Sequence, residues 1–576
     1  MESSRSWRIY SLTIIIFILG SGVLARLFSL QIFEFSYYTA LAQGQQQLYQ
    51  TLFPERGEIF MQDLSASRRN GEGKRCPLAV NREFKQAYLI PQDIPAEKKD
   101  GLAEQLAQLL DLDKSLISER INKIDDPYEP LKHKLDEKIA QMIEQIDVEG
   151  LELAPETWRY YPHQALAGHL LGFVGTTEQG KVGQYGLEGY YEDELSGQVG
   201  FLAGEKDIAG YWIPSLNQQF EPAQNGSDLI LTIDQNIQFK AEKELKEAIK
   251  KWGAAGGTII VMEPSTGAIR AMVSEPCFDP NEYNKVEGTD IFLNPATQKV
   301  YEPGSVFKPI TIAAGLDSGQ ISPETVYYDE GQVKIKGSVI RNVDGKAYQE
   351  QTMIQVLEKS LNTGAIFVQQ KVGEDIFQDY VQRFNFNKPT GVDLASEIAG
   401  NITNLFTGRE INLATISFGQ GITVTPLGLI TALGAIANQG KLMKPFIVEK
   451  IVQPDGTENT TRPQVVNQVI SLETAGTLTK MLVSAVDNGF ARKAGVVGYS
   501  VAGKTGTAQV ANLGEIGYSD KTIHTFVGYA PAFNPQFIIL IKLDEPQGVR
   551  FASDSITSVF QNMAKFLLNY LEIPPQ

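Results

Sequence analysis

The sequence predicts an α+β fold with an N-terminal transmembrane helix, a mixed α+β domain after it, and a C-terminal domain with a central antiparallel sheet flanked by helices. Three observations support this prediction: an uncharged apolar segment near the N-terminus, a middle region that mixes helical patterns with Gly- and Tyr-rich stretches, and strand patterns at both ends of the C-terminal region. The 576 residues suffice for two to four domains. The net charge of −17 argues against a nucleic-acid-binding protein.

The N-terminal segment predicts a membrane anchor. Residues 9–25 (IYSLTIIIFILGSGVLA) are 17 residues without a charge, and they follow Arg5 and Arg8. The apolar pattern resumes after Arg26, so we expect a tilted span to about Phe33. Basic residues on the leading side place the N-terminus in the cytoplasm and the rest of the chain outside. A cleaved signal peptide is the alternative, but the residues before Ala25 form a poor cleavage site.

The region after the anchor divides into a stalk and a first domain. Residues 1–35 comprise the cytoplasmic tail and anchor, and the Gln-rich residues 36–53 predict a helical juxtamembrane stalk. Residues 54–220 form a domain in which apolar residues recur every three to four positions over 96–110 and 131–146, which predicts two helices. Residues 217–227 are typical of a linker.

The C-terminal domain, residues 225–576, predicts a sheet built from both of its ends. Asp234 suits a helix N-cap, and an amphipathic helix follows to about Trp252. We expect strands over 258–262, 268–273, 524–529 and 537–543, and an amphipathic helix over 553–571. The helical middle, about 300–480, then packs against this sheet.

The stretch GYSVAGKTGTAQ (498–509) matches two motifs. It fits the phosphate-binding loop G-x-x-x-x-G-K-[ST], and from Lys504 onward it fits K-T-G. A phosphate-binding loop requires a helix directly after it, whereas Gly506 and Thr507 are poor helix-starting residues. Only 71 residues follow Thr505, too few for the parallel βαβ units of such a fold. The K-T-G interpretation is therefore favoured.

Two upstream motifs complete a trio that is typical of active-site serine enzymes. Ser305 and Lys308 form S-x-x-K, and Ser360 and Asn362 form S-x-N. Each motif alone is weak, because any of them also occurs as an ordinary polar stretch. Together with Lys504-Thr505-Gly506, in this order, they are characteristic of β-lactamases and penicillin-binding proteins.

The residue types fit acyl transfer. The Ser305 hydroxyl needs a base within hydrogen-bonding reach, and Lys308 serves if burial and Lys504 lower its pKa enough to neutralise it. Ser360 can relay a proton to the leaving amine, and Asn362 can hold a substrate amide. We expect Thr505, Gly506 and Thr507 to lie on a strand edge, where with Lys504 they bind a carboxylate and align an extended peptide.

The chain resembles the class B penicillin-binding proteins, D,D-transpeptidases that cross-link peptidoglycan. The resemblance covers nearly the whole chain and includes RGEIF (56–60), GLEGYYEDELSGQVG (186–200), FGQGITVTPLG (418–428) and FVGYAPAFNP (526–535). It implies that residues 54–220 are a non-catalytic, dimerisation-like pedestal and residues 225–576 the transpeptidase domain. It also implies an oxyanion hole formed by the backbone N–H groups of Ser305 and Thr507. One departure is the separation of Asp63 from Arg69-Asn70-Gly71, which the family usually joins.

The resemblance further implies substrates and partners. These are peptidoglycan stem peptides, β-lactams as acylating inhibitors, the cell membrane, and a polytopic glycan polymerase of the division machinery. KSLNTGAIF (359–367) and EKDIAGYWI (205–213) are more similar to the septal than to the elongation type. An elongation-type enzyme, a β-lactamase-like hydrolase and a weakly catalytic division scaffold are the alternatives. Leu361 argues against the hydrolase because it replaces the Asp of S-D-N.

No metal or cofactor is expected. The four histidines are scattered without ligand spacing, and Cys76 and Cys277 lie 201 residues apart and are interpreted as spectators.

Overall fold

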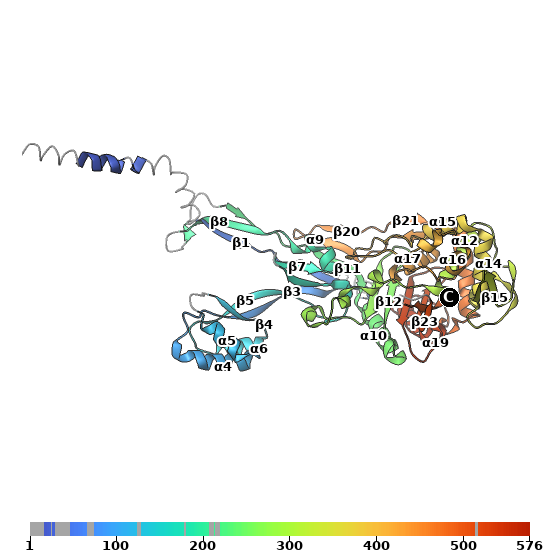
Figure 1. Cartoon of the computed structure of the whole chain (residues 1–576), viewed down its shortest axis with the longest axis horizontal. Helices are drawn as coiled ribbons and strands as arrows, with labels where there is room; N and C mark the ends of the chain where they lie inside the picture. Colours follow the sequence, from blue (N-terminus) through green and yellow to red (C-terminus); the bar gives the residue numbers. More distant parts are fainter. Residues whose placement is uncertain are drawn as a thin grey trace, which may run out of the picture. The chain divides into compact units, whose positions relative to one another are not determined.

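The computed structural model describes residues 16–24, 26–28, 47–65, 74–123, 128–177, 180–206, 212–213, 219–512 and 517–575. The chain forms two compact units (Figure 1). The smaller comprises residues 1–55 and 196–226, and the larger comprises residues 56–195 and 227–576.

The predicted anchor falls mostly outside the described residues. Residues 16–24 and 26–28 are helical, whereas 1–15, 25 and 29–46 are not described. Among the described helices, none combines the length and the apolar character needed to cross a membrane. The anchor thus stays a prediction from the sequence.

The smaller unit contains a four-stranded antiparallel sheet. Its central strand β8 (Gly200–Lys206) pairs with β1 (Gln47–Leu52), β9 (Trp212–Ile213) and β10 (Gln219–Glu221). The prediction of a helical stalk is wrong for residues 47–52, and the predicted linker contains β10. In both places pairing with β8 satisfies the backbone groups, a tertiary effect that local composition does not encode.

A seven-stranded sheet in the larger unit combines strands from the first domain and the C-terminal domain. Its order is β20 (Glu458–Thr460), β19 (Val448–Val452), β11 (Asp228–Asp234), β2 (Ile59–Asp63), β3 (Lys74–Leu89) and β4 (Glu129–Leu135), and β5 (Leu151–Tyr160) also pairs with β3. The β11–β2 pair is parallel, and the other pairs are antiparallel. This sheet ties the pedestal strands to the transpeptidase-like region.

Three helices cover one end of this sheet around a core that includes Leu106, Ile117 and Ile143. They are α4 (Lys99–Leu110), α5 (Lys114–Ile121) and α6 (Glu137–Glu144). The predicted helix over 131–146 is wrong in its first half, because residues 129–135 form β4. The register of β4 on β3 pairs Leu135 with Lys85, and the helix starts only after Asp136.

A buried ion network joins three segments of the pedestal. The Glu188 carboxylate is fully buried; Arg159 Nε lies 2.6 Å from its Oε1 and Arg56 Nη2 2.7 Å from its Oε2. Tyr161 also donates to Glu188. Burial alone would raise the pKa of Glu188, but the two guanidinium groups outweigh burial and lower it. The motifs RGEIF and GLEGYYEDEL are thus joined by the ion pair between Arg56 and Glu188.

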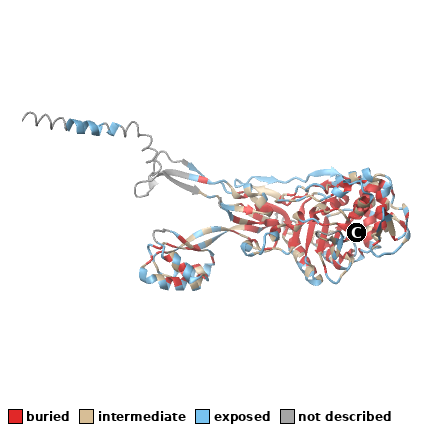
Figure 2. Ribbon diagram, in the orientation of Figure 1, coloured by how far each residue is buried: buried red, intermediate tan, exposed pale blue. Residues whose placement is uncertain are grey.

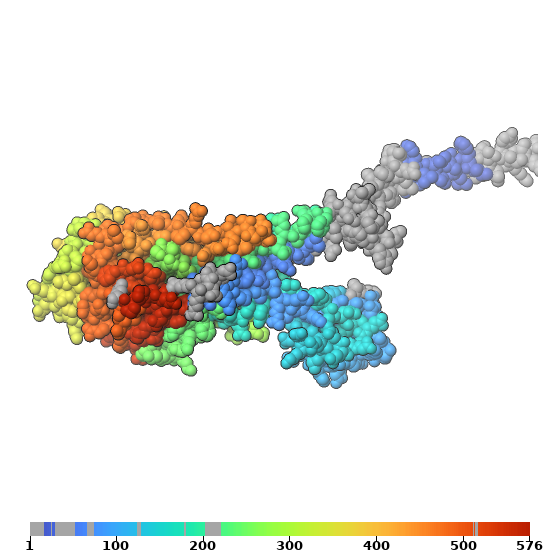
Figure 3. Space-filling view, turned by 180° about the vertical axis from the view of Figure 1, so that it is seen from behind, coloured from blue at the N-terminus to red at the C-terminus, as the bar shows by residue number. Residues whose placement is uncertain are grey.

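The second large sheet is antiparallel and is built from both ends of the C-terminal domain, as the sequence predicts. Its order is β13 (Ile269–Glu275), β12 (Gly256–Met262), β24 (Phe537–Asp544), β23 (Tyr518–Ala530) and β22 (Ala502–Ala511). Figure 3 shows green segments from the start of this domain beside red segments from its end. The strand β22 lies at the edge of the sheet.

Helices cover both faces of this sheet. The sequences of its central strands β12 and β24 are therefore almost continuously apolar. On β12, Ile259 and Val261 pack toward α10 (Gln235–Trp252) and α20 (Thr557–Tyr570), whereas Ile260 packs into the opposite core. That core contains α12 (Lys308–Asp317), α17 (Pro426–Ala437) and α18 (Leu472–Asp487). Figure 2 shows the buried residues concentrated in this domain. The N-cap prediction is confirmed, because Asp234 accepts from Ile237 N at 2.9 Å.

The other elements are short helices and hairpins. In the pedestal they are α7 (Gly168–Leu171), β6 (Phe173–Thr177), β7 (Gly180–Gln184), α8 (Gly186–Tyr190), α9 (Glu192–Ser196) and the 3₁₀ helix η2 (Ala96–Lys98). In the C-terminal domain they are η3 (Pro280–Lys285), η4 (Asp290–Phe292), α11 (Pro295–Gln298), η5 (Gly304–Phe307), β14 (Val326–Asp329), β15 (Gln332–Ile335), β16 (Ser338–Arg341), β17 (Gln349–Thr352), α13 (Met353–Glu358), α14 (Asn362–Val372), α15 (Glu374–Arg383), η6 (Thr403–Phe406), α16 (Glu410–Ile416), β18 (Lys441–Met443), β21 (Val465–Gln468), η7 (Arg492–Ala494) and α19 (Ala552–Ser555).

Replacing the buried carboxylate tests the ion network. We expect Glu188→Gln to lower the free energy of unfolding by about 3–5 kcal/mol, because two buried guanidinium groups lose their counter-charge. Urea denaturation measures the change. The exposed Glu458, which pairs with Lys450 at 2.7 Å, provides a control in which Glu458→Gln leaves the midpoint unchanged. Equal midpoints for both variants would contradict a stabilising role for the network.

Candidate active site

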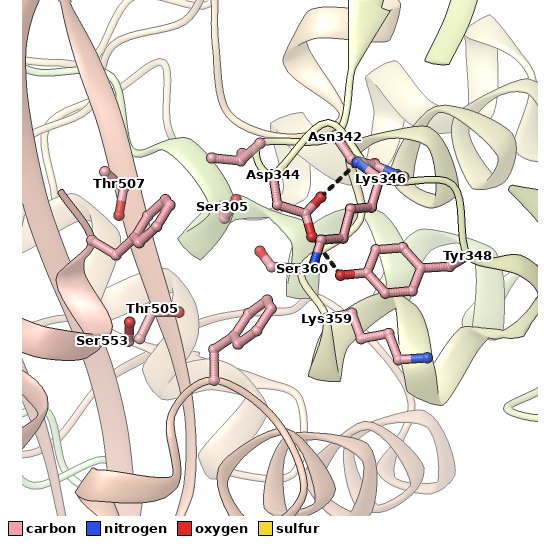
Figure 4. Close-up of a pocket in the computed structure, with 13 residues that line it drawn as sticks. Ser305, Asn342, Asp344, Lys346, Tyr348, Lys359, Ser360, Thr505, Thr507 and Ser553 are labelled. Atoms are coloured by element: carbon pink, nitrogen blue, oxygen red, sulfur yellow. Dashed lines mark hydrogen bonds between the residues drawn. The ribbon is translucent and has the colours of Figure 1, made fainter. Parts of the chain in front are cut away.

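A cavity of about 290 Å³ brings the three predicted motifs together (Figure 4). It is lined by Ser305 from η5, by Ser360 from the turn between α13 and α14, and by Thr505 and Thr507 from β22. A loop that follows β16, residues 342–348, closes another side of the cavity. Residues as far apart in sequence as Ser305 and Ser553 thus meet in one site.

The turn that carries Ser305 depends on a close backbone contact. Gly304 N donates to Gly419 O at 3.0 Å. A Cβ atom on Gly419 would lie 2.1 Å from Gly304 O, so no larger residue fits there. Gly419 also has a φ of +81°, which favours glycine. The F-G-Q-G stretch therefore serves to hold the turn on which Ser305 sits.

The strand that carries Lys504 runs directly against the same turn. A Cβ atom on Gly506 would lie 2.6 Å from Val306 Cγ2 and 2.8 Å from Pro303 O. The glycine of K-T-G is thus what allows the strand to approach Ser305. Since β22 is an edge strand, its free edge can pair with an extended peptide.

Two lysines share the hydroxyl of Ser360. Lys504 Nζ donates to Ser360 Oγ at 2.9 Å, and Lys308 Nζ donates to the same oxygen at 3.2 Å. Lys308 Nζ also donates to Ser360 O. Ser360 adopts a φ of 54°, the left-handed region that non-glycine residues rarely occupy. This conformation turns both its carbonyl and its hydroxyl toward Lys308, and strain of this kind is common at functional sites.

Both lysines are buried, and burial changes their charge. Lys308 is fully buried, and its pKa lies well below the usual value because of burial and the positive charge of Lys504. Burial lowers the pKa of Lys504 to about 7. Both shifts have the same cause: a low-dielectric site disfavours the ammonium form. Burial therefore favours the neutral form of Lys308, the state that a base requires.

Counting protons shows what the pair can do. A neutral Lys308 Nζ carries two N–H groups, which Ser360 O and Oγ accept, and it keeps one lone pair. Ser360 Oγ already accepts from both lysines, so its own O–H is available as a donor. In the described part of the chain, no hydrogen bond joins the Ser305 hydroxyl to Lys308. Such catalytic bonds often tighten only when substrate binds.

Asn362 begins α14 beside Ser360. Its Nδ2 donates to Arg341 O at 3.0 Å, while its Oδ1 is buried and has no partner among the described residues. Buried polar atoms are normally paired, so this oxygen is suited to accept an N–H from a ligand. One further N–H of Nδ2 also remains.

A buried carboxylate that the sequence analysis did not identify organises this side of the cavity. Asp329 is fully buried and accepts from Thr363 Oγ1 at 2.7 Å and from Tyr348 N at 3.0 Å. It also accepts from Asn342 Nδ2 at 2.9 Å, and Asn342 Oδ1 in turn accepts from Asn362 N at 3.0 Å. One carboxylate thus holds both the S-x-N helix and loop 342–348. The only local signal at Asp329 is the stretch Asp-Glu-Gly (329–331), which is indistinguishable from a surface turn.

The other predicted residues also have defined places. Thr505 is buried at the cavity, and Thr507 Oγ1 accepts from Ala552 N at 3.1 Å. Cys76 and Cys277 are free thiols and do not line the cavity. Among the described residues, no cluster of three or more His, Cys, Asp or Glu side chains could hold a metal ion.

Two family models match the chain. One, described as the penicillin binding protein transpeptidase domain, matches residues 257–565. The other, described as the penicillin-binding protein dimerisation domain, matches residues 51–231. Together they extend over the cavity and over the pedestal strands described above.

Relatives are similar over almost the whole chain. Stage V sporulation protein D of Bacillus subtilis (strain 168) is 32% identical over 530 residues, covering 91% of this chain and 79% of the relative. A peptidoglycan D,D-transpeptidase FtsI homolog of Mesostigma viride is 30% identical, covering 97% and 95%. The structure of penicillin binding protein 3 from Mycobacterium tuberculosis, complexed with aztreonam, is 26% identical with a TM-score of 0.69, covering 92% and 98%.

Proposed function

Because the chain belongs to the class B penicillin-binding proteins, we propose that it is a serine-type peptidoglycan D,D-transpeptidase with Ser305 as its nucleophile. The observation that carries the proposal is the pair of buried lysines that share the Ser360 hydroxyl in the cavity that contains Ser305. This arrangement supplies a neutral base and a proton relay without a cofactor or a metal.

The first half of the reaction forms an acyl-enzyme. Ser305 Oγ attacks the carbonyl between the two D-Ala residues of a stem peptide, and Lys308 Nζ takes the hydroxyl proton. The backbone N–H groups of Ser305 and Thr507 stabilise the developing oxyanion. When the C–N bond breaks, Ser360 passes its proton to the leaving amine of the terminal D-Ala and regains one from Lys308, which returns to its neutral form. The close approach of β22 to η5 at Gly506 supports this oxyanion hole.

Substrate binding uses the strand edge and the S-x-N helix. Lys504, Thr505 and Gly506 hold the terminal carboxylate, since Lys504 is charged below about pH 7 and Thr505 lines the cavity. The free Oδ1 of Asn362 accepts an amide N–H upstream of the scissile bond. In the second half, an amine of a neighbouring stem peptide attacks the ester and loses a proton to Lys308. Lys308 passes this proton to Ser305 Oγ as the ester C–O bond breaks and the amide cross-link forms.

Residues 9–33 anchor the protein in the cell membrane, with a cytoplasmic N-terminus and an extracytoplasmic catalytic domain. The uncharged run 9–25 behind Arg5 and Arg8 supports this topology. The septal character of EKDIAGYWI and KSLNTGAIF supports a role in division, with a polytopic glycan polymerase as partner through the anchor and pedestal.

Covalent labelling tests the nucleophile. We expect a fluorescent penicillin to label the full-length chain, and Ser305→Ala to lose the label, because the acyl group is attached to that oxygen. A denaturing gel measures both. A label that persists for hours is expected of a transpeptidase, whereas rapid loss indicates a hydrolase. A label retained by Ser305→Ala would exclude Ser305.

Removing the shared hydroxyl tests the proton relay. Ser360→Ala should lower the second-order rate of penicillin acylation by about 10²–10⁴-fold, the usual effect of losing a proton-transfer group. Ser553→Ala is the matched control, because Ser553 lines the same cavity but contacts neither lysine. Stopped-flow fluorescence measures the rates, and equal rates in the two variants would contradict the relay.

The lowered pKa of Lys504 predicts a pH dependence. As pH rises through about 7, Lys504 loses its proton and binds a carboxylate less well, so the second-order acylation rate should fall. In Lys504→Arg the guanidinium keeps its charge, so the fall of the acylation rate above about pH 7 should disappear. Acylation rates from pH 5 to 10 test both points. A wild-type rate that stays constant above pH 7 would show that Lys504 does not control binding.

A further inference from the structure

Loop 342–348 is held rigidly beside the catalytic residues. Asn342 and Tyr348, at its two ends, both donate to the buried Asp329. Inside the loop, Gly345 N donates to Asn342 O at 3.0 Å, and Asn342 Nδ2 donates to Lys346 O at 3.2 Å. The loop is thus pinned at both ends to the carboxylate that also holds the S-x-N helix.

The tip of this loop presents one negative and one positive charge. Asp344 and Lys346 both line the cavity, and Asp344 is its only carboxylate among the described residues. Figure 4 shows the two side chains close together, with the Asp344 carboxylate bonded to Tyr348 and to Lys346 N. Asp344 is fixed by Tyr348 OH and by Lys346 N, the latter at 3.1 Å. Two opposite charges are therefore displayed two residues apart on a rigid support.

Neither charge is neutralised by the protein. In the described part of the chain, no ion pair involves Asp344 or Lys346. The other lysine of the cavity wall, Lys359, does not compete: its Nζ donates to Gln351 Oε1 at 2.5 Å and lies 5.0 Å from the centre of the Tyr348 ring. The loop therefore offers an acceptor for an ammonium group and a donor for a carboxylate.

We propose that Asp344 and Lys346 bind the zwitterionic end of a diamino diacid side chain in the donor stem peptide. Such a side chain ends in an ammonium and a carboxylate on one carbon, whereas a lysine-type side chain ends in an ammonium alone. This inference rests on the proposed function, and it names the substrate class of the site. The argument for this proposal is charge complementarity: Asp344 matches the ammonium and Lys346 matches the carboxylate.

The position of the loop assigns it to the donor peptide. Asn362, which binds the donor amide upstream of the scissile bond, donates its backbone N–H to Asn342 at 3.0 Å. The side chain next to that amide is the part of the donor within reach of a loop bonded to the same residue. Asp344 and Lys346 therefore contact the side chain of the residue that precedes the two D-Ala residues.

Competition with penicillin labelling tests the proposal on the full-length chain in detergent. Two synthetic peptides ending in D-Ala-D-Ala are compared, identical except for meso-diaminopimelate or L-lysine as the preceding residue. The measured quantity is the peptide concentration that halves the rate of labelling by fluorescent penicillin. We expect the diaminopimelate peptide to compete about three- to fivefold better, the effect of one partly exposed charge pair.

The variants distinguish the two charges. Lys346→Ala should abolish the preference, whereas Asp344→Asn should weaken both peptides by about the same three- to fivefold. Glu350→Gln removes a nearby exposed charge that does not line the cavity, and should change neither value.

Each other outcome overturns the proposal. These outcomes are no competition by either peptide, no preference in the wild type, and a preference that survives Lys346→Ala. An equal loss for both peptides in Lys346→Ala also overturns it. An unchanged thermal unfolding midpoint in each variant shows that the fold is intact. Failure of the proposed function would instead appear as no Ser305-dependent labelling of the wild type.

Discussion

The site depends on one constraint: Lys308 and Lys504 must both be buried while they share the hydroxyl of Ser360. Lys308 can act as a base only because burial and Lys504 make its charged form costly. Ser360 makes this arrangement possible. Because its backbone is left-handed, its carbonyl and its hydroxyl both accept hydrogen bonds from the Lys308 amine. Such a cluster cannot exist on a flexible surface, where water would restore both charges.

The rest of the fold positions this cluster. The antiparallel sheet brings β22, from the end of the chain, against the helices of its middle, and glycine at 506 closes the distance to Ser305. The seven-stranded sheet pairs β11 of the same domain with β2 of the pedestal, and Glu188 forms ion pairs with Arg56 and Arg159 that hold the pedestal motifs together. The pairing of β2 with β11 thus connects the pedestal with the catalytic domain.

Much of this architecture follows from local patterns. The capped helix after Asp234, the apolar strands β12 and β24, and the three motifs can be read from the sequence because their signals are local. The helix prediction is wrong for residues 47–52 and 131–135, since only pairing with β8 and β3 makes them strands. Asp329 could not be recognised, because its importance arises from partners up to 34 residues away that converge only after folding.

The cavity also explains why an acyl-enzyme would wait for an amine. Rapid hydrolysis needs a base that activates water, a task performed by a carboxylate in class A β-lactamases. Here Leu361 occupies the middle of S-x-N and is buried in the core. Asp344 is the only carboxylate among the described lining residues, and it already accepts from Tyr348 OH and Lys346 N. An incoming amine needs less activation than water, since it is the stronger nucleophile, and Lys308 can take its proton. Among the described lining residues, no further carboxylate is therefore present to activate water.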